Sequence, residues 1–206
     1  MRLGMLVDVD RCIGCDTCAI ACKTENNLPD DVWWNNVWTV GGEQDHTPAK
    51  TPGGPSMWFL TVACQHCDNP PCVPVCPTGA TFKREKDGVV LIDYDKCIGC
   101  GACVEACPYD GVRTRNADVI RRANPFSLGG YDVQPQQPAT VSKCTFCEQR
   151  LEEGRTPACV EVCPARARFF GDLDDPDSEV SKLLETRESF TLHPEAGTNP
   201  SVHILK

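Results

Sequence analysis

Apolar residues along this chain occur in short runs rather than in long periodic stretches. Three runs, L-G-M-L-V-D at 3–8, M-W-F-L-T-V at 57–62 and G-V-V-L-I-D at 88–93, each lie shortly before a group of cysteines. Short runs rich in Val, Leu and Ile predict β-strands. The K-D-G at 86–88 predicts a turn that joins the third strand to A-T-F-K-R-E at 80–85 in a hairpin.

The helical patterns are equally brief. T-F-C-E-Q-R-L-E-E at 145–153 predicts a helix that ends at Gly154, because glycine favours the left-handed conformation just after a helix. A longer helix is predicted to begin near Ser178 and to include V-S-K-L-L-E-T-R, with acidic residues near its start. R-A-R-F-F-G-D at 166–172 predicts one more strand. No apolar stretch approaches the ~20 residues of a membrane-spanning helix, so we expect no direct membrane span.

Two irregular segments, 30–57 and 113–139, are predicted to be insert loops. The first contains W-W-N-N-V-W and the second contains the run Q-P-Q-Q-P. Two interpretations of Trp33, Trp34 and Trp38 stay open. They are either anchors for a partner protein, where Trp is enriched, or large side chains that cover a small core.

Composition suggests that something other than aliphatic packing holds the chain together. Its 206 residues include 17 prolines, 16 glycines and 16 cysteines. Metal–ligand bonds supply folding free energy directly, so metal centres are predicted. The residues before Cys12 leave no room for a secretory signal, which weighs against a secreted disulfide scaffold. The net charge of −9 is opposite in sign to a nucleic-acid-binding surface, and no nucleic-acid partner is expected.

The cysteines form an internal repeat of four groups. Groups I and III share D-x-D-[RK]-C-I-G-C-x-x-C-x-x-A-C, and groups II and IV share P-x-C-V-x-V-C-P. This alternating order indicates duplication of a two-motif unit. The groups are Cys12, Cys15, Cys18 and Cys22 (I); Cys64, Cys67, Cys72 and Cys76 (II); Cys97, Cys100, Cys103 and Cys107 (III); and Cys144, Cys147, Cys159 and Cys163 (IV).

The spacing within each group is typical of iron-sulfur proteins. In the bacterial ferredoxin run C-x2-C-x2-C-x3-C-P, three thiolates bind one cluster and the fourth binds the other cluster of a pair. Proline follows the last cysteine of groups II, III and IV, whereas Lys23 follows group I. A tetrahedral zinc site built from four cysteines is the alternative. His66, inside C-Q-H-C, is expected to form a local hydrogen bond rather than to bind iron.

These motifs resemble the four-cluster iron-sulfur subunit of the dimethyl sulfoxide reductase family of molybdopterin oxidoreductases. The resemblance includes the C-x2-C-x4-C-x3-C of group II and the C-x2-C-x11-C-x3-C of group IV. The opening M-R-L-G-M-L-V-D and A-C-K-T-E-N-N, and the closing G-D-L-D-D-P and H-P-E-A-G-T-N-P, are most similar to the small subunit of respiratory arsenate reductases.

The resemblance implies four 4Fe-4S clusters and assigns their ligands. The four sets are Cys12, Cys15, Cys18 and Cys163 for the cluster nearest the molybdenum subunit; Cys22, Cys144, Cys147 and Cys159 for its pair; Cys64, Cys67, Cys72 and Cys107 for a third; and Cys76, Cys97, Cys100 and Cys103 for a fourth.

The fold class that follows is α+β, with two nested ferredoxin-like units of two 4Fe-4S clusters each. The outer unit is expected to combine residues 1–29 with 140–172, and the inner unit to occupy 58–112. Residues 173–206 are expected to form a C-terminal docking tail.

The function implied by the resemblance is electron transfer within an oxidoreductase, with no substrate-converting site on this chain. The expected partner is a large catalytic subunit that holds the molybdopterin cofactor, in a reductase for arsenate, a sulfur compound, a sulfoxide or a related substrate. A membrane anchor or a cytochrome donor stays open as a further partner. The alternatives are a free polyferredoxin and the iron-sulfur subunit of a formate dehydrogenase or hydrogenase. Both a cytoplasmic location and export with a signal-bearing partner are compatible with this.

Three basic residues are candidates for setting the cluster potentials. Arg11, Lys96 and Lys143 each directly precede the first cysteine of a group. A positive charge there favours the more negative, reduced cluster if it is buried, whereas solvent ions screen an exposed charge within ~10 Å.

Overall fold

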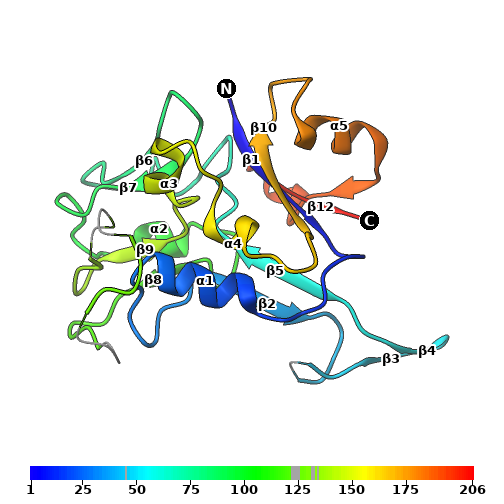
Figure 1. Cartoon of the computed structure of the whole chain (residues 1–206). Helices are drawn as coiled ribbons and strands as arrows, with labels where there is room; N and C mark the ends of the chain where they lie inside the picture. The colour runs from blue at the N-terminus through cyan, green and yellow to red at the C-terminus, as the bar shows by residue number, and fades with distance from the viewer. Residues whose placement is uncertain (45, 122–125, 131–132, 134) are drawn as a thin grey trace.

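A four-stranded sheet joins the two ends of the chain (Figure 1). The computed structural model describes residues 1–44, 46–121, 126–130, 133 and 135–206. The strand order is β10-β1-β12-β11, with β1 antiparallel to β10 and parallel to β12. The strands are β1 (Leu3–Asp8), β10 (Arg168–Asp172), β11 (Ser189–Phe190) and β12 (Val202–Leu205).

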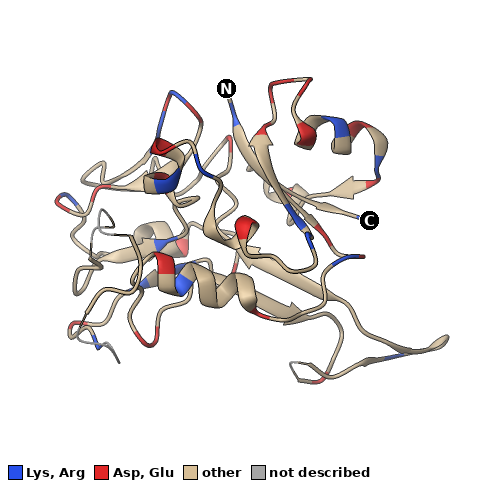
Figure 2. Cartoon of the chain, viewed as in Figure 1, with Lys and Arg blue, Asp and Glu red and all other residues tan. Residues whose placement is uncertain are grey.

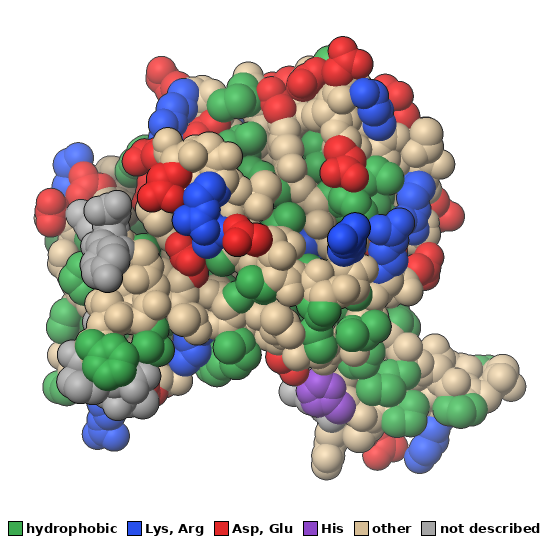
Figure 3. All heavy atoms as spheres, viewed as in Figure 1, with side chains coloured by type: hydrophobic (Ala, Val, Ile, Leu, Met, Phe, Trp, Pro, Cys, Tyr) green, Lys and Arg blue, Asp and Glu red, His purple; other side chains and the backbone are tan. Residues whose placement is uncertain are grey.

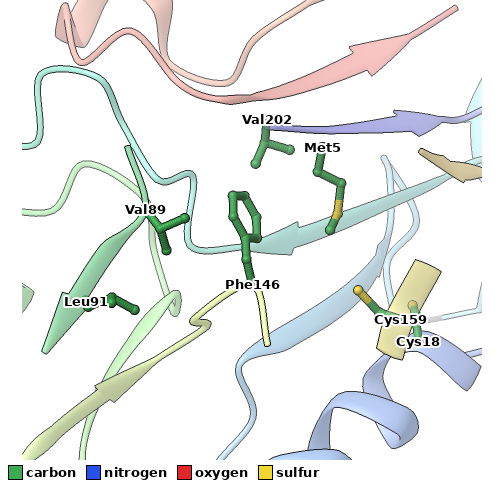
Figure 4. Close-up of a cluster of buried hydrophobic side chains, with 7 residues drawn as sticks. All are labelled: Met5, Cys18, Val89, Leu91, Phe146, Cys159 and Val202. Carbon is green, nitrogen blue, oxygen red and sulfur yellow. The ribbon is translucent and has the colours of Figure 1, made fainter. Parts of the chain in front are cut away.

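The two faces of β1 contact different parts of the protein, because successive side chains of a strand point to opposite faces. Leu6 packs with Val180 of α5 (Glu179–Thr186) and with Leu205. Met5 packs on the other side, in an apolar core that also contains Cys18, Val89, Leu91, Phe146, Cys159 and Val202 (Figure 4). Cys18 of group I and Cys159 of group IV therefore lie on the side of the sheet opposite α5.

The other strands form four antiparallel hairpins or pairs. In Figure 3 the β3–β4 hairpin stands out from the body of the molecule as an arm. The β8–β9 pair closes the second insert by joining its two ends. The pairs are β2 (Asn35–Thr39) with β5 (Phe59–Ala63), β3 (Ala49–Thr51) with β4 (Gly54–Ser56), β6 (Thr81–Lys83) with β7 (Val90–Ile92), and β8 (Arg113–Arg115) with β9 (Val141–Lys143).

Groups I, III and IV carry cysteines on short helices, whereas residues 64–76 of group II form turns instead of a helix. The sequence A-C-V-E occurs twice and forms a helix each time, as α2 and α4. Helix α1 packs against α4, which brings group I beside group IV. The helices are α1 (Thr17–Glu25), α2 (Ala102–Glu105), α3 (Glu148–Glu152) and α4 (Ala158–Glu161), and a 3-10 turn, η1, covers Pro194–Ala196.

The strands predicted before the cysteine groups are confirmed as β1, β5 and β7, and the hairpin predicted around 86–88 is confirmed as β6–β7. The strand predicted at 166–172 is β10. The two predicted helices are α3, followed by Gly154 with φ +72°, and α5, where the Ser178 side chain accepts a hydrogen bond from the backbone N–H of Ser181.

Three segments differ from the sequence-based expectation. The insert 30–57 contains three strands, β2, β3 and β4, and the insert 113–139 begins with strand β8. The segment 173–206 forms α5, β11 and β12, and β12 lies inside the sheet beside β1, so only its docking role stays a prediction. Residues 45, 122–125, 131–132 and 134 of the two predicted inserts lie outside the described residues. None of the helices in the described part of the chain is long and apolar enough to cross a bilayer.

Candidate metal centres

One cavity is lined by cysteines of two groups that are far apart in the sequence. Cys12, Cys15 and Cys18 of group I and Cys163 of group IV line it, in a volume of about 370 Å³ that includes its opening to solvent. These are the four residues that the resemblance assigns to one cluster. Gly14 bends the loop with φ +65°, and a Cβ atom there would lie 2.4 Å from the Phe59 ring.

A second cavity, of about 440 Å³, lies next to the first, and Val7, Thr61 and Arg168 line both. Cys22, Cys144, Cys147 and Cys159, the second assigned set, line it together with Cys64. In Figure 4, Cys18 of α1 lies beside Cys159 of α4; the first lines one cavity and the second lines the other. Cys64 was expected only in the third set, so its position places the third set beside the second.

The third set lies close together around Arg113. The Arg113 guanidinium donates a hydrogen bond to Cys72 Sγ at 2.9 Å. Burial and the nearby Cys64 and Cys72 thiolates together raise the pKa of Cys107 to about 11. Burial and the same two neighbours also raise the pKa of the Cys67 thiol. Cys64, Cys67, Cys72 and Cys107 are therefore neighbours, as the resemblance implies.

The fourth set is brought together in part. Cys97 and Cys103 lie in one apolar core with Val90 and Val141. Burial raises the pKa of Cys76, but hydrogen bonds from Thr81, Thr78 and Ala80 outweigh that effect and lower it to about 7. Cys100 is exposed. The grouping of Cys76 and Cys100 with Cys97 and Cys103 stays a prediction.

All 16 cysteines are free of disulfide bonds. Within the described ranges, no group of three or more His, Cys, Asp or Glu side chains has the arrangement that would hold a single metal ion. Backbone N–H groups donate to cysteine sulfur, as from Thr81 to Cys76 at 3.4 Å, from Phe146 to Cys144 at 3.4 Å and from Ala167 to Cys163 at 3.3 Å.

Three basic side chains are buried beside these cysteines. Arg113, Lys143 and Arg168 are only 5 %, 1 % and 6 % exposed. Lys143 Nζ donates to the carbonyls of Val90 and Cys144, and Arg168 donates to Cys159 Sγ at 3.4 Å. Among the residues that the structure describes, none of the three forms an ion pair with a carboxylate, in contrast to the buried Arg150, which pairs with Glu25 and Glu161.

Anionic metal clusters fit these surroundings. A buried charge without a partner is strongly destabilising, so three unpaired cations require negative charge nearby. Burial and neighbouring thiolates raise the pKa of Cys22, so four thiolates in one cavity need a cationic core between them. Asn35 Nδ2 and Thr61 Oγ1 are buried at the second cavity without a hydrogen-bond partner, and both are donors that sulfur can accept from.

Sequence reasoning identified Lys143 but missed Arg113 and Arg168. Arg11 and Lys96, the other two candidates, are exposed and paired with Asp8 and Asp93. The one available signal was the place of Arg168 in the predicted strand 166–172, next to group IV, whereas Arg113 lay in a predicted loop.

His66 forms a hydrogen bond, although its partner is distant in the sequence and not local as expected. Its Nδ1 accepts from the backbone N–H of Val90 at 3.1 Å, and its ring stacks on Phe146. Burial lowers the pKa of His66 well below its usual value, and the positive charges of Lys143 and Arg113 lower it further. The ring is therefore neutral, with its proton on Nε2.

The fold and these cysteine sites define a ferredoxin-like iron-sulfur protein of α+β class. A family model described as a 4Fe-4S dicluster domain matches residues 55–124 and 116–173, and a 4Fe-4S binding domain model matches residues 9–25.

Curated proteins match nearly the whole chain. A protein of Halobacterium salinarum, named as an iron-sulfur subunit of a dimethyl sulfoxide reductase, is 47 % identical over 98 % of this chain and 78 % of its own length. The arsenate respiratory reductase iron-sulfur subunit of Shewanella sp. is 39 % identical over 100 % and 97 %. A subunit of the tetrathionate reductase of Salmonella typhimurium is 41 % identical over 99 % and 72 %. The chain belongs to the family of iron-sulfur subunits of molybdopterin oxidoreductases, and its role is electron transfer within an oxidoreductase complex.

Proposed function

We propose that this chain relays electrons through four 4Fe-4S clusters to or from a large catalytic subunit that holds a molybdopterin cofactor. The ligands are the four cysteine sets that the resemblance assigns. The observation that supports this most directly is the crosswise sharing of cysteines: Cys163 lines the cavity of group I, and Cys22 lines the cavity of group IV. Ferredoxin-type cluster pairs exchange their fourth ligand in this way.

The nested arrangement follows from the same sharing. Groups I and IV, which begin and end the repeat, form the outer unit, and groups II and III form the inner unit. Two observations support this arrangement. Helix α1 packs against α4, and Cys64 of group II borders the second cavity, which joins the two units.

In the chemistry, the protein binds the clusters, shields them from water and supplies buried positive charges beside them. A bound 4Fe-4S cluster supplies one-electron transfer. The thiolates bind it, the loops at Gly14 and Gly99 wrap three of them around each site, and backbone N–H groups such as that of Ala167 donate to the ligand sulfur. Buried cations beside the cysteines favour the more negative state.

The substrate is converted on the partner subunit in this proposal. The relatives are named for dimethyl sulfoxide, arsenate and tetrathionate reductases, which supports a complex that reduces a small oxidised compound of this kind. We therefore place the chain in a respiratory-type reductase.

Ligand variants test the assignment. The wild-type chain, purified without oxygen, is expected to contain about 16 iron and 16 inorganic sulfide per chain. Cys163→Ser should alter the same electron paramagnetic resonance (EPR) signal as Cys15→Ser, although the two residues are 148 positions apart in the sequence. Cys159→Ser should alter a different signal, although it is only four residues from Cys163.

Two results would contradict the proposal. One is an iron content that matches a single ion per four cysteines. The other is a Cys163→Ser variant that loses the same signal as Cys159→Ser, which would mean that each group binds its own cluster.

A further inference from the structure

Arg168 borders both cavities of groups I and IV and also donates a hydrogen bond to one of their cysteines. It lines the first cavity with Cys163 and the second with Cys159. It begins β10, where it is paired in register with Val7 of the central strand β1. Its backbone is therefore fixed by the sheet, and its side chain extends from the sheet into the wall between the cavities.

The contacts of Arg168 fix the position of its guanidinium but do not neutralise its positive charge. One guanidinium nitrogen donates to Cys159 Sγ at 3.4 Å and Met5 Sδ at 3.3 Å, and another donates to Asn35 Oδ1 at 2.9 Å. The amide of Asn35 is neutral, where an aspartate would have formed an ion pair. An arginine stays protonated in such surroundings, so the wall between the cavities carries a full positive charge.

The two cavities differ in their exposure. Cys15 of the first set is exposed and two others are half-buried, whereas three of the four cysteines of the second set are buried. Burial disfavours the more negative, reduced state of a cluster, so the second site by itself would have the lower potential. The direct contact of Arg168 is with Cys159 of that second set, where its charge offsets burial most.

We propose that Arg168 is a shared redox-setting residue, whose single buried charge raises the reduction potentials of the two clusters of the outer unit together and brings the deeper one closer to its neighbour. This inference rests on the proposed function, because it assumes clusters at both sites. Burial lowers the pKa of the guanidinium, but nearby thiolates such as Cys159 and Cys18 outweigh burial and raise it.

The test is an EPR-monitored redox titration of the cluster-loaded chain. Arg168→Met removes the charge and keeps an unbranched side chain. We expect both outer potentials to shift to more negative values, more for the cluster bound by Cys159, with the two inner potentials unchanged. Arg168→Lys keeps the charge and should restore most of the shift. The signals are assigned beforehand with the Cys15→Ser and Cys159→Ser variants.

Asn35→Asp provides a second route if Arg168→Met does not fold. The substitution is nearly isosteric and places a carboxylate on the guanidinium, so it should also lower both outer potentials while the arginine stays in place. It also removes the Asn35 Nδ2 donor at the second cavity, so the shift of the first potential is the one that reports on Arg168. Arg11→Gln is the matched control. It removes a charge directly before Cys12, but Arg11 is 52 % exposed, so no shift is expected.

Each outcome has one meaning. If the iron content is wild-type and neither Arg168→Met nor Asn35→Asp moves the outer potentials, or if only one potential moves, Arg168 is not a shared redox-setting residue. If Arg168→Lys shifts them as far as Arg168→Met, hydrogen bonding rather than charge sets the potential, and the inference is wrong. A wild-type chain without about 16 iron contradicts the proposed function instead.

Discussion

Asp8 ends β1 and connects the sheet to the first cysteine group. Its side chain is 1 % exposed and accepts hydrogen bonds from the backbone N–H groups of Asp10 and Arg11 at 3.1 and 3.2 Å. It also forms ion pairs with Arg11 and with Arg187, beyond α5. Burial raises the pKa of Asp8, but Arg187 and Arg11 outweigh burial and hold this pKa below its ordinary value.

Asp8→Asn should destabilise the protein by about 1–3 kcal/mol at pH 7, because it weakens hydrogen bonds to a charged group. The folded-state pKa is below the unfolded value, so this stabilisation is present above about pH 4 and is lost as the pH falls through the folded pKa. We expect the difference in Tm between wild type and variant to be constant from pH 7 to pH 5 and to shrink below about pH 4. Circular dichroism of the oxygen-free, cluster-loaded proteins measures it.

Wild type and Asp8→Asn carry the same acid-labile clusters. The loss of clusters in acid therefore affects both Tm values alike and cancels in their difference. A Tm difference that stays constant down to pH 3 would mean that the carboxylate charge of Asp8 does not stabilise the fold.

Single residues differ in how well the sequence predicts their role. The cysteines follow from their spacing alone, and Lys143 follows from its place before Cys144. Arg113 and Arg168 do not, because their burial depends on strands that pair across long distances in the sequence. Arg11 and Lys96 have the same sequence context as Lys143, yet they are exposed because their loops lie at the surface.

At the scale of elements, the loop of group III shows how glycine shapes a cysteine motif. Gly99 has φ +65°, and a Cβ atom there would lie 1.6 Å from the carbonyl oxygen of Ala139. Gly101 has φ +81°, but nothing lies within 4 Å of its Cβ position. The two glycines therefore share the unfavourable backbone conformation and differ only in the space around them.

Gly99→Ala should prevent assembly of one cluster, because the loop has to move away from Ala139. Iron content is expected to fall by about a quarter, with loss of one EPR signal. Gly101→Ala, the matched control, should cost about 1–2 kcal/mol of stability for its backbone conformation and keep its iron. Equal iron content in the two variants would show that the close approach to Ala139 does not constrain the loop.

Helix α5 packs against the sheet on the face away from the cysteines. Val180 is fully buried against Leu6 and Leu205. We expect Val180→Ala to lower the free energy of unfolding by about 2 kcal/mol through lost burial and a small cavity. Iron content and potentials should not change, because none of these side chains lines a cysteine cavity.

Lys182→Ala, on the exposed side of the same helix, is the control and should change stability by less than about 0.5 kcal/mol. Urea unfolding followed by circular dichroism, with an iron assay on the same samples, distinguishes the two effects. A lower iron content in Val180→Ala would show that the two faces of the sheet are coupled.

The elements that the sequence predicts are those marked by a nearby motif, such as a helix cap or a turn. Helix α5 has its Ser178 cap, and β6–β7 has its K-D-G turn. Strand β12 has no such signal, because its pairing partner β1 is nearly the whole chain away and only the folded register brings Val202 beside Met5. The same holds for β2, whose partner β5 follows only after the arm.

At the scale of the whole molecule, the repeat leaves two similar exposed sites. Cys15 and Cys100 are the exposed cysteines. Beside them Ile13 is 61 % exposed and Ile98 is 66 % exposed, at equivalent positions of groups I and III. Asp and Glu positions are spread along the loops and helices of the chain (Figure 2). Electrons are expected to enter and leave near these two surfaces, because both sites come close to the surface there.

The order of the sites was predictable only through the resemblance. The repeat indicates paired clusters, but spacing alone does not say whether group I shares with group II or with group IV. The packing of α1 on α4 favours group IV, and the sequence has no signal for that contact.

The resemblance places the Cys12 site nearest the catalytic subunit, and this gives a prediction for the complex. Ile13→Glu should weaken binding to the purified large subunit at least tenfold, about 1.4 kcal/mol, because a carboxylate is then buried in the interface. Ile98→Glu makes the same change at the equivalent position of group III and should leave this affinity unchanged. Oxygen-free biolayer interferometry measures both.

Charge gives this experiment a second readout. The chain has a net charge of −9 before cluster charges are added, so a basic docking surface on the partner is expected. Affinity of the wild type should then fall as ionic strength rises, since salt screens exposed charges over ~10 Å. If Ile98→Glu weakened binding as much as Ile13→Glu, the added negative charge alone would explain both losses. If only Ile98→Glu weakened it, the catalytic subunit would lie at the group III end and the assigned order of the clusters would be reversed.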